Sequence, residues 1–130
     1  TDPETLPAWL TEEDLDVYTR AFRRTGFRGP LNWYRNITRT WELMAPFHGA
    51  TVRVPALFIV GERDGVRAFT QAAIDALPRT VPLLRRSLVL PGCGHWTQQE
   101  RPAEVTAAML DFLRELDGGA LYPSVTNPPG

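Results

Sequence analysis

Residues 54–64 read VPALFIVGERD, and this stretch decides the fold class. A continuous apolar run bounded by a proline and a glycine is typical of a strand that is buried on both faces, as in a parallel sheet. A second short apolar run, residues 87–90, stops at a Pro-Gly pair. We therefore expect two parallel strands whose carboxyl ends open into loops at the same edge of a sheet.

Helical patterns follow each of these strands. Residues 66–77 favour a short helix that ends at Pro78, and residues 102–116 favour an amphipathic helix. The apolar positions of the second helix share one face: Val105, Ala108, Met109, Phe112, Leu113 and Leu116. The order strand, loop, helix, strand, loop, helix predicts a parallel α/β unit.

Residues 1–48 carry only helical signals. Thr11 is a predicted N-cap, and Gly26 is the predicted stop of the first helix. A second helix is expected to begin near Pro30 and to end at Pro46. The sequence thus predicts a helical segment over 1–48, an α/β segment over 49–117 and a flexible tail over 118–130.

Composition excludes several classes of protein. A chain of 130 residues with a net charge of −1 fits one domain and lacks the basic excess of a nucleic-acid-coating protein. No apolar run is long enough to span a membrane, and the first residues do not resemble a secretory signal. The single cysteine, Cys93, fits a reducing compartment, so we expect a cytoplasmic protein. Two histidines 47 positions apart do not have the spacing of metal ligands.

The chemistry is expected in the loops that leave the two strands, because ligands bind beyond the carboxyl ends of parallel strands. Asp64 follows the first strand and His95 follows the second. A carboxylate that accepts a hydrogen bond from one imidazole nitrogen orients the other nitrogen as a general base. The sequence predicts that Asp64 and His95 form such a pair, with Glu62 as the weaker rival acid. Glycines on both sides of Cys93 would let the backbone turn sharply.

Three motifs resemble the α/β-hydrolase fold and, within it, the soluble epoxide hydrolases. They are PALFIVGERD at 55–64, GHW at 94–96 with Gln98 and Pro102, and GFRGPLNWYRN at 26–36. The order acid then histidine also matches the fold's chain order of nucleophile, acid and histidine. The resemblance covers residues 8–116.

This resemblance implies a role for each matching residue. Tyr34 would donate its hydroxyl hydrogen to the epoxide oxygen as the ring opens. His95 would activate the water that hydrolyses an ester intermediate, and Asp64 would orient His95. Trp33 and Trp96 would line a pocket for a small apolar epoxide. The resemblance implies no cofactor and no metal.

The chain departs from the family in three features: the aspartate nucleophile, the glycine- and proline-containing oxyanion segment and the second lid tyrosine all belong to the first half of the family's fold. The family's aspartate nucleophile lies on a strand-to-helix elbow in the first half of the fold, and no residue here follows the G-x-[S/D]-x-G elbow pattern. The resemblance therefore implies the C-terminal half of an epoxide hydrolase, namely the end of the lid and the last part of the core. Two strands would expose a sheet edge and apolar surface, so we expect a complementary N-terminal half or self-association.

Other interpretations stay open at this point. A haloalkane or haloacid dehalogenase of the same fold would use the same acid–histidine pair, and a binding or assembly module would have the pocket without the catalysis. Asp64 could be only a helix N-cap, and Tyr34 only a packed aromatic. His48 fits a surface position at the junction of the two segments. Cys93 is disfavoured as a nucleophile because adjacent turn residues seldom face each other.

Overall fold

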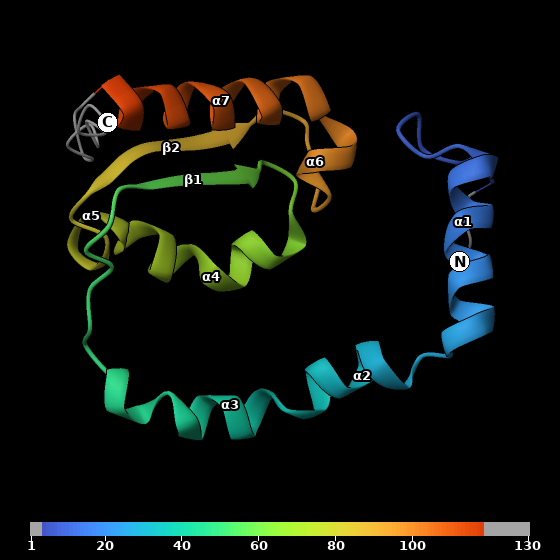
Figure 1. Cartoon of the computed structure of the whole chain (residues 1–130), viewed down its shortest axis with the longest axis horizontal. Helices are drawn as coiled ribbons and strands as arrows, with labels where there is room; N and C mark the ends of the chain where they lie inside the picture. The colour runs from blue at the N-terminus through green and yellow to red at the C-terminus, as the bar shows by residue number, and fades with distance from the viewer. Residues whose placement is uncertain (1–3, 119–130) are drawn as a thin grey trace, which may run out of the picture. The chain divides into compact units, whose positions relative to one another are not determined.

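The computed structural model describes residues 4–118, and the chain divides into two units between Ala50 and Thr51. Figure 1 shows the helices and strands of both units along the chain. The predicted tail over 118–130 lies outside the described residues, apart from Gly118 at the end of the last helix.

The first unit is helical, as the sequence predicts. Its elements are α1 (Glu12–Thr25), α2 (Arg28–Arg35), α3 (Ile37–Leu43) and the 3-10 helix η1 (Ala45–Phe47). A capping box begins α1: the Thr11 hydroxyl oxygen accepts from the Asp14 N–H at 3.1 Å, and the Asp14 carboxylate accepts from the Thr11 N–H at 3.0 Å. Gly26 ends the helix at φ +66°, a conformation that favours glycine. Both predicted ends of α1 are confirmed.

The prediction of one helix between Pro30 and Pro46 is wrong, because the helix is interrupted at Asn36. That residue has φ −92° and ψ 3°, and its side-chain nitrogen donates to the Asn32 carbonyl at 2.7 Å. Asparagine side chains compete with the backbone for hydrogen bonds, which disfavours them inside helices. The result is two short helices, α2 and α3, in place of one long helix.

The first unit has no buried residue between residues 4 and 50. Its large apolar side chains face solvent, with Trp33 80% exposed and Trp41 76% exposed. The rings of Phe22 and Phe27 stack on each other, with their centroids 4.5 Å apart. This unit is therefore held mainly by local hydrogen bonds and contacts between neighbouring residues.

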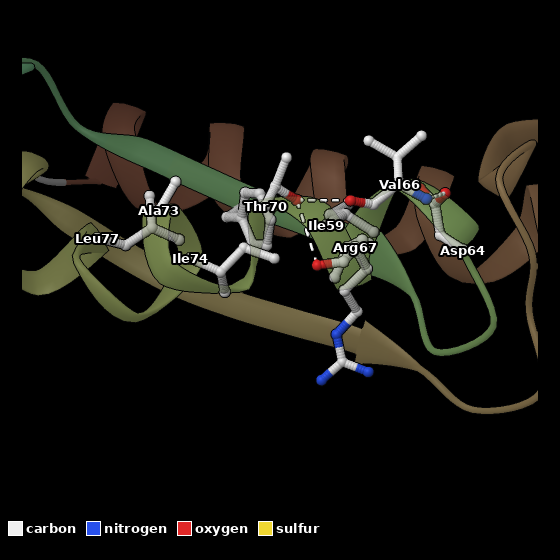
Figure 2. Close-up of a pocket in the computed structure, with 10 residues that line it drawn as sticks. Ile59, Asp64, Val66, Arg67, Thr70, Ala73, Ile74 and Leu77 are labelled. Carbon is white, nitrogen blue, oxygen red and sulfur yellow. Dashed lines mark hydrogen bonds between the residues drawn. The ribbon is translucent and has the colours of Figure 1, made fainter.

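The second unit is a parallel α/β unit, as predicted. Its elements are β1 (Ala56–Gly61), α4 (Gly65–Asp75), α5 (Leu77–Thr80), β2 (Leu84–Leu90), α6 (Thr97–Glu100) and α7 (Pro102–Gly118). The two strands pair in parallel, and Gly61 lies opposite Leu90 at their carboxyl ends. Figures 1 and 2 show α4 and α7 on opposite faces of this sheet.

Three details of the second unit differ from expectation. Pro78 does not end a helix but lies in the first turn of α5, where its missing N–H leaves no hydrogen bond unmade. The short helix α6 was not expected, since four residues carry no periodicity. The second strand begins at Leu84 instead of at residue 87, and Arg86 within it pairs with Glu115 and Asp111 of α7.

A small core lies at the carboxyl end of the sheet. Leu90, Cys93 and Val105 are buried together, and Ile59 packs against them. The expected apolar face of α7 is only partly covered, because Val105 and Ala108 are buried while Met109 and Leu113 are each 51% exposed. The core therefore lies directly beneath the loops that carry Asp64 and His95.

Across residues 4–118, no helix combines the length and the apolar character that a bilayer crossing requires.

Candidate active site

Asp64 is fixed where the β1–α4 loop enters its helix. It is the N-cap of α4, and its Oδ1 accepts a hydrogen bond from the Val66 N–H at 2.8 Å. Asp64 therefore does cap the helix, but that is not its only contact. Because a carboxylate has two oxygens, capping the helix leaves capacity for a second partner.

That second partner is His95. The imidazole Nδ1 lies 3.0 Å from Asp64 Oδ2 and 3.1 Å from Oδ1. An ionised carboxylate can only accept, so Nδ1 carries a hydrogen in this contact, and in the neutral imidazole Nε2 then has the lone pair. The Asp64 side chain is 11% exposed and the His95 side chain is 56% exposed. Among the residues that the structure describes, Nε2 has no hydrogen-bond partner, and the exposed ring leaves it open to water.

Hydrogen bonds keep the Asp64 carboxyl ionised. The Val66 N–H does most to hold the pKa of Asp64 below its usual range, and the hydrogen bond and charge of His95 act in the same direction. Partial burial opposes them without reversing the shift. The carboxylate is therefore available to accept from His95 at neutral pH, which is the state that orients an imidazole as a general base.

The two loops approach each other at Gly61. A Cβ atom at this position would lie 2.0 Å from the Gly94 carbonyl oxygen and 2.5 Å from that of Cys93. Both neighbours are backbone atoms, so only glycine fits here. The Arg63 N–H donates to the Cys93 carbonyl at 2.8 Å and joins the loops a second time. This close contact brings residue 64 within hydrogen-bond distance of residue 95.

Two glutamates anchor the histidine loop. Glu62, the rival acid, accepts from the Gly92 N–H at 2.8 Å, and among the described residues it forms no hydrogen bond or ion pair with His95. Glu100 accepts from the N–H groups of Gly94 and Trp96. The sequence does not predict this role for Glu100. Thr97-x-x-Glu100 matches the pattern of a capping box, but Trp96 is the N-cap of α6 and its side chain makes no capping hydrogen bond.

Cys93 has the properties of a core residue. It is 1% exposed, and burial, followed by the nearby Glu100 carboxylate, raises the pKa of its thiol. A thiol held in its neutral form is a poor nucleophile. Within residues 4–118, no group of three or more His, Cys, Asp and Glu side chains is arranged to hold a metal ion.

A shallow groove of about 360 Å³ runs between β1 and α4, with Asp64 among its lining residues. Figure 2 shows Asp64 and Val66 beside the first turn of α4, with Ala73, Ile74 and Leu77 further along. The Arg67 guanidinium donates from Nη1 to the Glu62 carbonyl at 3.4 Å. The groove is largely apolar, so it offers packing surface and few polar contacts.

The predicted aromatic residues divide between the units. Trp96 is 54% exposed, and its ring meets that of His95 edge-on with the centroids 5.2 Å apart. Trp33 and Tyr34 lie on α2 of the first unit, where Trp33 and Trp41 line an open apolar groove of about 670 Å³. Within the second unit the structure thus brings Asp64, His95 and Trp96 together. The meeting of Tyr34 and Trp33 with these residues stays a prediction.

Known epoxide hydrolases are similar to this chain over most of its length. Epoxide hydrolase A of Mycobacterium tuberculosis is 49% identical over 116 residues, which cover 89% of this chain and 35% of that protein. Epoxide hydrolase 2 of Siraitia grosvenorii is 44% identical over 117 residues, which cover 87% of this chain and 37% of that protein. The homologues of this chain are epoxide hydrolases. The chain spans about a third of the length of these curated relatives, and no family model matches it.

Solved structures of epoxide hydrolases show the same fold. The crystal structure of epoxide hydrolase A from Mycobacterium thermoresistibile is 50% identical, with a TM-score of 0.80 over 88% of this chain and 35% of that one. An epoxide hydrolase from an endophytic Streptomyces is 49% identical, with a TM-score of 0.85 over 88% of this chain and 34% of that one. The expected C-terminal portion of an α/β-hydrolase fold is thereby confirmed.

Proposed function

We propose that this chain is the lid-end and C-terminal core portion of an epoxide hydrolase that adds water to a small apolar epoxide to give a vicinal diol. Residues 1–48 are assigned to the lid, residues 49–117 to the core and residues 118–130 to a flexible tail. The observation that carries the proposal is the hydrogen bond between His95 Nδ1 and the Asp64 carboxylate in a chain whose homologues are epoxide hydrolases.

In the proposed reaction an aspartate outside this chain opens the epoxide and forms an ester. His95 Nε2 then takes a proton from water, and the resulting hydroxide attacks the ester carbonyl carbon. The bond between the carbonyl carbon and the substrate oxygen breaks, that oxygen takes the hydroxyl proton of the tetrahedral intermediate, and the carboxylate nucleophile is restored. Asp64 stabilises the imidazolium that forms at His95. This imidazolium returns its proton through solvent to the oxygen that became negative on ring opening, so the diol leaves neutral.

Tyr34 is assigned to the ring-opening step. Its phenolic O–H would donate to the epoxide oxygen, which gains negative charge as the carbon–oxygen bond breaks. Trp33 and Trp96 would supply apolar walls around the substrate. These roles require α2 to cover the Asp64–His95 pair, an arrangement that follows from the resemblance to the family.

The proposed reaction needs an aspartate nucleophile that this chain does not supply, so it needs a partner. We assign the nucleophile to a complementary N-terminal portion, which would also cover the free edge of the two-stranded sheet. Alternatively, a second copy of this chain would cover that edge. A single reduced cysteine supports a cytoplasmic location.

A grafted enzyme tests the proposal. This chain would replace the matching C-terminal third of epoxide hydrolase A from Mycobacterium tuberculosis, and diol formation from styrene oxide would be measured. We expect turnover by the graft, none by this chain alone, and a loss on the order of a hundred- to ten-thousand-fold in His95→Gln. His48→Gln is the matched control and should retain activity. The His95→Gln graft should also accumulate an ester, seen as a mass increase of one epoxide.

A folded graft that forms no diol would contradict the proposal. Halide release from a chloroalkane by the same graft would then identify the dehalogenase alternative, and saturable epoxide binding without turnover would identify a binding module. If Tyr34→Phe left the diol rate unchanged, the assigned role of Tyr34 would be wrong.

A further inference from the structure

One carboxylate holds the backbone on both sides of His95. The Gly94 nitrogen lies 2.6 Å from Glu100 Oε2, and the Trp96 nitrogen lies 3.1 Å from Glu100 Oε1. Each carboxylate oxygen thus accepts one N–H, and His95 is the residue between the two donors. Hydrogen bonds to an ionised acceptor are roughly twice as strong as those between neutral groups.

Glu100 is itself firmly placed. Its backbone N–H donates to the Trp96 carbonyl at 2.8 Å, so its side chain and its backbone both contact Trp96. It also packs directly on Gly94, where a Cβ atom would lie 2.8 Å from Glu100 Oε1. A side chain at position 94 would therefore displace the carboxylate from its present position.

The imidazole has few contacts of its own. Its side chain is 56% exposed, and within residues 4–118 its hydrogen-bond and aromatic partners are the Asp64 carboxylate and the Trp96 ring. An exposed side chain keeps its orientation only if its backbone is fixed and its one hydrogen bond is maintained. A displacement of about 1 Å at a reacting group can cost on the order of a hundredfold in rate.

We propose that Glu100 is a positioning residue: by accepting both flanking N–H groups, it keeps His95 Nδ1 on Asp64 and leaves Nε2 available to water. The consequence for catalysis rests on the proposed function, whereas the consequence for the imidazole does not.

Glu100→Gln is the informative variant. The amide has nearly the same shape but only one acceptor oxygen, so it can satisfy one of the two N–H groups and presents a donor to the other. Glu104→Gln is the matched control. Glu104 is an exposed acid on α7 that pairs with Arg101 at 3.6 Å, so its replacement removes the same charge and no hydrogen bond that Glu104 makes to the histidine loop.

The first measurement uses the 130-residue chain without substrate. Nitrogen-15 NMR gives the fraction of neutral His95 that carries its hydrogen on Nδ1. We expect Glu100→Gln to lower this fraction and Glu104→Gln to leave it unchanged. In an Asp64→Asn background the effect of Glu100→Gln should disappear, because the two residues act through the same imidazole. An unchanged tautomer ratio in folded Glu100→Gln would overturn the proposal.

The second measurement uses the grafted enzyme. Glu100→Gln should lower kcat on the order of ten- to a hundredfold and leave kcat/KM nearly unchanged, because His95 acts after the ester has formed. A role in folding alone would lower both quantities in proportion to the loss of active protein, and that result would count against positioning. If the graft forms no diol at all, the proposed function fails, and the tautomer measurement still decides the role of Glu100.

A wild-type measurement covers the case in which Glu100→Gln does not fold. The amide hydrogens of Gly94 and Trp96 should exchange slowly with solvent, although both residues lie in a surface loop. Exchange of both at the rate of an unprotected peptide would show that Glu100 does not hold them. Glu100→Asp adds a milder variant, since it keeps the charge but is too short to reach both N–H groups and should also shift the tautomer.

Discussion

The two units of this chain use similar fractions of apolar residues in different ways. In the second unit Leu90, Cys93 and Val105 are buried together beneath the loops that carry Asp64 and His95. In the first unit no residue between 4 and 50 is buried, and the apolar faces of its helices are exposed to solvent. A site built over its own core keeps its geometry locally, whereas exposed apolar helices depend on whatever covers them.

The largest expected effect tests the contact between the two loops. Gly61→Ala places a methyl group against the carbonyls of Cys93 and Gly94, which are backbone atoms that cannot rotate away. We expect the second unit to lose about 3 kcal/mol or more of unfolding free energy, measured by chemical denaturation. Gly65→Ala is the control, because a Cβ at that position has no neighbour within 4 Å. A Gly61→Ala protein as stable as Gly65→Ala would show that the loops do not approach as closely as described.

Much of the second unit could be predicted from the sequence because its signals are local. A proline, five apolar residues and a glycine specify β1, and the acid and histidine that follow the two strands meet because parallel strands end at the same edge. The roles of Gly61 and Glu100 could not be predicted. Gly61 is required by the backbone of a loop about thirty residues later in the sequence, and Glu100 by two backbone N–H groups. The periodicity of apolar residues carries no information about such contacts.

The first unit shows the opposite limit. Thr11 and Gly26 specify both ends of α1, since capping is a local interaction. The interruption at Asn36 depends on a side-chain hydrogen bond to the Asn32 carbonyl, which competes with an otherwise continuous helical pattern. The position of Tyr34 relative to His95 is a long-range property. The family resemblance implies it, and the hydrogen bonds within α2 do not specify it.

The second expected effect compares the units directly. Leu90→Ala removes a buried side chain that is 7% exposed, and it should cost about 2–4 kcal/mol. Ile37→Ala removes a side chain on α3 that is 59% exposed, and it should cost less than about 1 kcal/mol in this chain by itself. Hydrogen exchange with mass spectrometry resolves the two units and so measures each loss separately. A cost for Ile37→Ala equal to that for Leu90→Ala would mean that the first unit is covered, which would remove the difference between the units.

The smallest expected effect concerns the pH dependence that Asp64 contributes. Its pKa in the folded chain lies below the unfolded value of about 3.9, so the stabilisation is present above that pH and is lost as the pH falls through the folded pKa. The difference in unfolding free energy between the wild type and Asp64→Asn should therefore be constant near pH 5 and should narrow below about pH 4.

Two further variants separate the causes of this shift. Val66→Pro removes the N–H that lowers the pKa most, at a position in the first turn where proline is tolerated, and the preceding Gly65 has no Cβ for the proline ring to contact. His95→Gln removes the lesser cause. Carbon-13 NMR of the Asp64 carboxyl should show a larger rise in pKa for Val66→Pro than for His95→Gln. The reverse order would mean that His95, and not the first turn of α4, keeps the Asp64 carboxylate ionised. The ionisation of the acid would then depend on the imidazole instead of on the helix that Asp64 caps.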